Sequence, residues 1–129
     1  MDVEKLKKIV PWQELLVIED SKELMGVLEA MAGRIDIPAL GGTDGKGDAA
    51  AVLHYFNTMG AGDWYIFEAD LETGEAFGFV TLSGDIADPF AEFGYIDLNA
   101  LCRDARINLD LHFSGISKKE IMKKKWGKE

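Results

Sequence analysis

Four carboxylates that lie close together in the chain are the first candidates for chemistry. Glu68, Asp70, Glu72 and Glu75 surround a predicted hairpin turn. Paired carboxylates can bind a metal ion or exchange protons with a substrate. Such a group is also typical of the charged, solvated end of a hairpin. If the group has a function, we interpret it as an acidic docking surface for a basic partner.

The chain contains two histidines, one of which has a carboxylate nearby in sequence. Asp110 and His112 lie in a stretch that alternates as an edge strand would, so both side chains would project from one face. They could supply two metal ligands, but a metal site needs about three or four, and no neighbouring residue completes the set. We interpret them as the polar face of an edge strand, and we expect neither a resident metal nor another cofactor. His54 lies in an apolar run, which predicts a hydrogen-bonded histidine in or near the core.

A glycine-rich segment at residues 41–48 resembles part of a phosphate-binding loop through Gly45 and Lys46. Leu40 stands where that motif requires its first glycine, and Gly47 stands where it requires a metal-binding Ser or Thr. The segment therefore predicts a flexible loop without a phosphate site.

Cys102 is the only cysteine in the chain, so no intramolecular disulfide can form. It follows Leu98 and Leu101 at a helical spacing that predicts burial, and a buried cysteine behaves as a small hydrophobic side chain. We assign no catalytic residue. Whether the protein is an enzyme stays open, with the sequence favouring a non-enzymatic role.

The apolar pattern predicts an α+β fold with a small antiparallel sheet of about four to five strands. Residues 63–70 and 75–82 are aromatic and β-branched, and the short segment between them ends in Gly74, which predicts a hairpin. Strict alternation along the first strand predicts two faces. One would carry Trp64, Ile66, Glu68 and Asp70, and the other Tyr65, Phe67 and Ala69.

Helices are expected both before and after these strands in the sequence. Residues 1–35 form an N-terminal helical arm that Pro11 interrupts, with Asp20 as the predicted N-cap of its last helix and Gly33 as its end. Asp97 is expected to cap a helix that follows the sheet and runs to about residue 105. An edge strand is expected at 108–113. A capping box from Ser117 to Glu120 predicts a basic C-terminal helix at 117–129. We expect the arm, a central α+β segment at 36–116 and this helix to form a single compact domain.

Charge is distributed unevenly along the chain, whose formal net charge is −9 at pH 7. Residues 48–116 contain twelve acidic side chains against only Arg103 and Arg106. Because such a segment would repel phosphate backbones, we expect no direct nucleic-acid binding. The lysine-rich C-terminal helix is interpreted as a solvated face.

The N-terminus lacks the apolar stretch of a signal peptide, and no apolar run approaches the length of a membrane span. Together with the single cysteine, these features predict a cytoplasmic protein without a membrane interaction.

Several short blocks in the central segment match one known family in order and spacing. The chain resembles the bacterial family catalogued as domain of unknown function 2958 over roughly residues 36–114. The resemblance implies a small α+β domain that is often encoded on plasmids and other mobile elements. That family has no established catalytic or binding residues to carry over. The matching blocks are Ile37–Leu40, Val52–Phe56, Asp63–Ile66, Asp70–Gly78, Glu92–Leu98 and Asp110–Phe113.

These observations lead to one main functional hypothesis and two alternatives. We expect an acidic accessory factor that binds a basic or nucleic-acid-handling protein. The first alternative is a metal-dependent or small-molecule enzyme, which would require Glu68, Glu92 and His112 to converge in one pocket. The second is a homodimer formed through a sheet edge or the helical arm. The candidate interaction surface combines aromatic and ionisable residues, namely Trp64, Glu68, Asp70, Glu75, Glu92, Tyr95 and His112.

Overall fold

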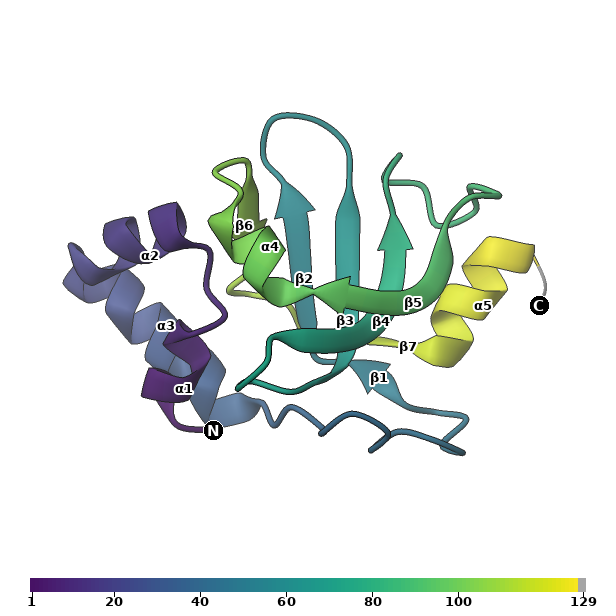
Figure 1. Cartoon of the computed structure of the whole chain (residues 1–129), viewed down its shortest axis with the longest axis horizontal. Coiled ribbons are helices and arrows are strands. Elements are labelled where there is room, and N and C mark those ends of the chain that lie inside the picture. Colours follow the sequence, from purple (N-terminus) through teal and green to yellow (C-terminus); the bar gives the residue numbers. More distant parts are fainter. Residues whose placement is uncertain (128–129) are drawn as a thin grey trace.

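Strand-forming residues build a five-stranded antiparallel sheet in the computed structural model, which describes residues 1–127 (Figure 1). The strand order is β5-β4-β3-β2-β6, and within the described residues a second, small sheet pairs β1 with β7. Five helices accompany these sheets in the same part of the chain, which confirms the predicted α+β fold. The strands are β1 (Ala50–Ala51), β2 (Leu53–Asn57), β3 (Asp63–Ala69), β4 (Glu75–Thr81), β5 (Glu92–Asp97), β6 (Ile107–Leu109) and β7 (Ile116–Ser117).

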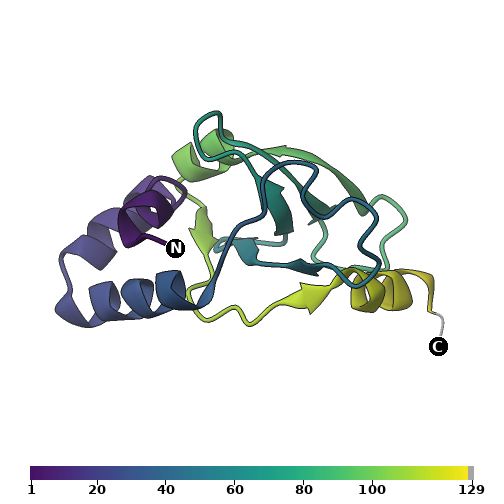
Figure 2. The same cartoon turned by 90° about the horizontal axis from the view of Figure 1, so that it is seen from below.

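The N-terminal helical arm lies at one end of the molecule and the last helix at the other (Figures 1 and 2). The arm packs on one face of the main sheet, where Leu6 and Leu28 share a core cluster with Tyr55 and Ile66. The Tyr55 hydroxyl donates a hydrogen bond to the Ile9 carbonyl, which ties the arm to β2. The helices are α1 (Val3–Lys7), α2 (Trp12–Glu19), α3 (Lys22–Arg34), α4 (Leu98–Arg103) and α5 (Lys118–Trp126).

The boundaries of α3 differ from the sequence prediction at both ends. Ser21, not Asp20, is the N-cap, because its side-chain oxygen accepts the Leu24 N–H at 3.2 Å. Gly33 lies inside the helix, which ends at Arg34 with the next residue in an extended conformation. A helix can therefore end without a left-handed glycine where the chain leaves directly in an extended direction.

The other face of the sheet is covered by α5. Ile121 of this helix is fully buried and clusters with Phe67 and Phe79. The predicted capping box is confirmed, since Ser117 and Glu120 exchange both hydrogen bonds. Lysines of the helix also make defined contacts, and the Lys118 Nζ lies 5.5 Å from the centre of the Phe93 ring. Lys128 and Glu129 of the predicted basic segment lie outside the described residues.

A β-bulge at Phe67 corrects the predicted faces of β3. The register between β3 and β4 shifts between Ile66 and Glu68, so Phe67 is the extra residue. Ala69 consequently packs in the core cluster of Ile66 instead of the cluster of Phe67. Glu68 pairs with Phe77 and therefore lies on the face opposite to the one that strict alternation predicts.

Gly78 allows the close approach of β4 to β3 at the bulge. A Cβ atom added at Gly78 would lie 1.9 Å from the Tyr65 carbonyl oxygen, which is backbone and cannot rotate away. Gly94 pairs with Gly78 from β5, yet a Cβ atom there would meet no heavy atom within 4 Å.

These two glycines provide a matched pair for a stability test. We expect Gly78→Ala to lower the free energy of unfolding by more than about 2 kcal/mol, because the backbone of β3 must move. Gly94→Ala should change it by less than about 1 kcal/mol. Chemical denaturation of both variants measures the difference, and equal losses would contradict the close approach at Gly78.

No helix within residues 1–127 has both the length and the apolar character needed to span a bilayer.

Candidate functional site

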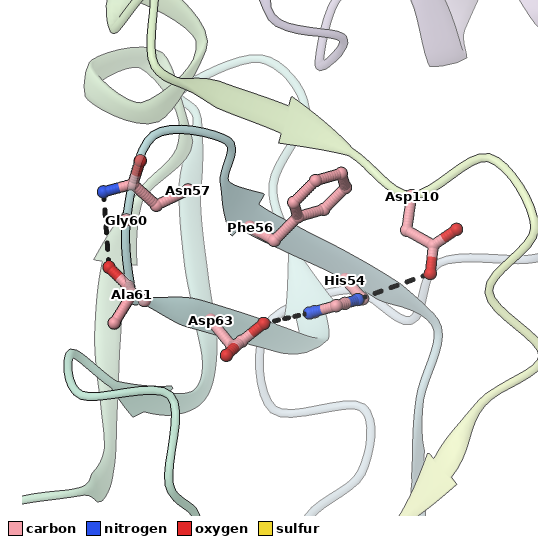
Figure 3. Close-up of a pocket in the computed structure, with 8 residues that line it drawn as sticks. His54, Phe56, Asn57, Gly60, Ala61, Asp63 and Asp110 are labelled. Atoms are coloured by element: carbon pink, nitrogen blue, oxygen red, sulfur yellow. Dashed lines mark hydrogen bonds and ion pairs between the residues drawn. The ribbon is translucent and has the colours of Figure 1, made fainter.

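A group of polar side chains in the sheet is centred on His54 in β2, beside a cavity (Figure 3). Its Nε2 atom lies 2.7 Å from the Asp63 carboxylate and its Nδ1 atom 3.4 Å from the Asp110 carboxylate. The imidazole stacks on the Tyr65 ring with centroids 4.7 Å apart. The prediction of a hydrogen-bonded histidine near the core is confirmed. The adjacent cavity, of about 430 Å³, is lined by His54, Phe56, Asn57, Gly60, Ala61, Gly62, Asp63 and Asp110.

The side chains of His54, Asp63 and Asp110 join three segments, of which the one with Asp110 lies 56 residues after His54 in the sequence. Asp63 begins β3, and Asp110 follows β6, whose strand ends at Leu109. Both ring nitrogens already face carboxylates, and the lining of the cavity contains no hydroxyl, thiol or amine that could act as a nucleophile. What the geometry supports is a polar clamp that joins β2, β3 and the segment after β6.

The edge strand predicted at 108–113 is shorter than expected. Asp110 and His112 lie in a turn, where an Asp110 carboxylate oxygen accepts the His112 N–H at 2.9 Å. The two side chains therefore do not share one strand face. The alternation in this stretch was misleading because Asp110 closes a turn with its own side chain.

Glu68 is buried and binds the glycine-rich loop. Its carboxylate accepts hydrogen bonds from the Gly41 N–H at 2.8 Å and the Thr43 N–H at 2.9 Å, and also from the Thr43 hydroxyl. Burial acts to raise the pKa of Glu68, but the hydrogen bonds from Thr43 and Gly41 outweigh it and hold the pKa below its usual value. At 3% exposure, Glu68 does not belong to an interaction surface, which corrects the prediction.

The residues required by the enzyme hypothesis do not converge. Glu92 begins edge strand β5, whereas His112 follows the opposite edge strand, β6. Strands lie about 4.8 Å apart, so the four spacings across the sheet amount to about 19 Å. Glu68 is already engaged by the loop. Within residues 1–127, no group of three or more His, Cys, Asp or Glu side chains is placed to hold a metal ion.

Cys102 is partly buried in α4, in agreement with its predicted role as a small hydrophobic side chain. Burial, together with the nearby Glu14, raises the pKa of the thiol to about 12. The reactive thiolate form is therefore scarce near neutral pH.

Two of the predicted surface residues, Glu75 and Tyr95, meet at one end of strands β4 and β5. Glu75 pairs directly with Asp97 across the two strands, and both side chains are exposed. Tyr95 is 74% exposed, and its ring contacts the edge of Phe77 at 5.7 Å between centroids. A hollow of about 390 Å³ at this end is lined by Thr73, Glu75, Tyr95, Ile96, Asp97 and Asn99.

Asp97 belongs to this group but was predicted only as a helix cap. It does cap α4, since its carboxylate accepts the Ala100 N–H at 3.2 Å. Its position opposite Glu75 follows from the strand register, for which the sequence contains no direct signal.

The remaining predicted surface residues lie elsewhere. Trp64 packs against the core on the face covered by the arm. Asp70 shapes the hairpin turn, because its carboxylate accepts the Glu72 N–H at 2.9 Å. Glu92 is exposed at the far end of β5 from Asp97, and His112 is exposed beyond β6.

The β6 edge of the sheet is closed by the helical arm. The Glu14 carboxylate of α2 accepts the Leu109 N–H at 2.7 Å. Burial raises the pKa of Glu14 to about 7, with the Leu109 hydrogen bond opposing the shift and Asp110 adding to it.

The raised pKa of Glu14 makes stability depend on pH. The folded protein binds the proton of the Glu14 carboxyl group more tightly than the unfolded chain does, because this glutamate has a pKa near 4.5 when unfolded. The resulting stabilisation is complete below about pH 4.5 and is lost as the pH rises through about 7. We expect wild type to lose on the order of 2 kcal/mol relative to Glu14→Gln between about pH 5 and 8. Denaturation curves measure this, and parallel pH profiles would contradict it.

Comparison of the chain with protein-family models, with curated proteins and with solved structures yields no match. The resemblance to the family catalogued as domain of unknown function 2958 therefore stays a prediction.

Proposed function

We propose that this chain is a non-enzymatic interaction protein, an accessory factor that binds a partner through basic residues of that partner. The observation that carries the proposal is the directly paired Glu75 and Asp97 beside the exposed ring of Tyr95. None of the ion pairs within residues 1–127 involves either carboxylate. Like charges at directly opposite positions destabilise a sheet. A cation supplied by a partner would remove that repulsion.

The chemistry of the hollow favours an ammonium or guanidinium group. The two carboxylates supply charge, and the tyrosine ring supplies a π-face for a cation. The chain already contains such a contact on the same strand, where the Lys118 ammonium lies over the ring of Phe93. Tyr95 continues this aromatic row beyond the part that α5 covers.

The biological setting belongs to the same proposal. The acidic character of residues 48–116 supports a partner that itself handles nucleic acid, because a surface that attracts phosphate also attracts carboxylates. A cytoplasmic location agrees with the single cysteine. The resemblance to a family encoded on mobile elements agrees with a bacterial accessory role.

The alternative of an enzyme that uses Glu68, Glu92 and His112 has no geometric support, since these residues occupy a buried loop anchor and two opposite sheet edges.

A charge-neutral double variant tests the proposal. We expect Glu75→Gln/Asp97→Asn to weaken binding of a labelled oligolysine peptide about tenfold at about 20 mM salt, because two favourable charges are lost. The asparagine keeps the cap of α4. Binding of the wild type should weaken steeply at about 200 mM salt. Fluorescence anisotropy measures both effects.

The matched control is Glu23→Gln/Glu29→Gln, which makes the same change in net charge on exposed positions of α3. We expect this control to bind nearly as wild type does. The proposal fails if wild type does not bind the peptide at low salt, or if both double variants lose affinity equally.

A further inference from the structure

The two edges of the main sheet differ in how their backbone groups are satisfied. Strand β6 has three residues, and the arm supplies the Glu14 carboxylate to its Leu109 N–H. Strand β5 has six residues and forms the opposite edge. Within residues 1–127, no further strand pairs with its outer side.

The register identifies the backbone groups on the open side of β5. The Leu98 N–H donates to the Gly74 carbonyl at 2.9 Å, so residue 98 faces β4. The hydrogen-bonding direction alternates along an antiparallel strand. Gly94 therefore also faces β4, whereas the N–H and C=O groups of Phe93, Tyr95 and Asp97 point away from the sheet. No hydrogen bond within residues 1–127 uses these outward N–H groups.

The charges at the ends of β5 select against a second copy of this chain. Two copies paired through this edge would bring Glu92 and Asp97 of both chains to one interface, between molecules that each have a net charge of −9. Like charges gathered along one edge repel each other, which opposes that pairing. The same carboxylates favour a strand that carries lysine or arginine.

We infer that β5 is a docking edge that takes up an extended, lysine- or arginine-rich segment of the partner as a sixth strand of the sheet. The outward N–H and C=O groups supply main-chain hydrogen bonds, which give affinity. Glu92 and Asp97 flank the added strand with negative charge, and the hollow beside Tyr95 receives one of its cationic side chains. This inference rests on the proposed function and specifies its binding mode.

Amide hydrogen exchange, followed residue by residue by NMR, tests the binding mode. In the free protein we expect fast exchange at Phe93, Tyr95 and Asp97 and slow exchange at Gly94 and Ile96. An alternating lysine–threonine peptide should slow exchange at the first three amides by at least about tenfold, because they become hydrogen-bonded. The same peptide N-methylated at every peptide bond keeps its charge but loses its donors, so it should bind at least about tenfold more weakly.

A pair of variants at one position provides a second measurement. Tyr95→Ala removes the ring and keeps the outward N–H, whereas Tyr95→Pro also removes that N–H. Proline is tolerated on an edge strand where the N–H faces solvent. We expect the proline variant to bind the peptide several-fold more weakly than the alanine variant.

Each result has a distinct meaning. Slowed exchange at the three outward amides, together with weak binding of the methylated peptide, supports strand addition. If the peptide binds but exchange at these amides stays fast, strand addition is overturned and the proposed function still stands. Absence of binding by any basic peptide at low salt overturns both. If exchange at these amides slows with rising protein concentration in the absence of peptide, the occupant is a second copy of the chain. That result overturns the choice of a basic partner.

Discussion

The fold depends on one constraint, which is that the central strands carry large apolar side chains on both faces. Tyr55 and Ile66 are fully buried on one face, and Phe67 and Phe79 are buried on the other. A sheet with two apolar faces must be covered on both, because exposed apolar area costs about 25 cal/mol per Å². The two covers come from opposite ends of the chain. The arm, together with Leu98 and Leu101 of α4, covers one face and α5 covers the other, so these terminal segments contribute to the core as well as to the surface.

The side chains best suited to chemistry serve this architecture. Glu68 holds the glycine-rich loop, Glu14 closes the β6 edge, and His54 joins three segments through two aspartates. Buried polar groups require hydrogen-bond partners, and within residues 1–127 no buried side-chain nitrogen or oxygen lacks one. The glycine-rich segment 41–48 is likewise part of this architecture. The amides of Gly41 and Thr43 bind the protein's own carboxylate.

The β5 edge is the surface that remains available for a partner, and its length, its charge and its exposed tyrosine all fit that role. The opposite edge is short and closed by a side chain, while β5 is long, flanked by carboxylates and adjacent to an exposed tyrosine. Natural sheets usually shield such edges with charge. On β5 the shielding charges have one sign, so they oppose self-pairing and attract a basic strand at the same time. The structural asymmetry of the two edges thus agrees with the charge asymmetry of the chain.

The fold class, the hairpin at Gly74 and the caps at Asp97 and Ser117 can be predicted from the sequence alone, because these features depend on residues a few positions apart. The faces of β3, the burial of Glu68 and the pairing of Glu75 with Asp97 depend on how the strands and loops pack together. The bulge at Phe67 moves the side chains that follow it to the opposite face of the sheet. No local sequence pattern predicts one extra residue in a strand. Glu68 is buried because a loop 25 residues away in sequence folds over it. The meeting of Glu75 with Asp97 requires the register of β4 against β5, which is set by packing across the whole sheet and not by alternation within either strand.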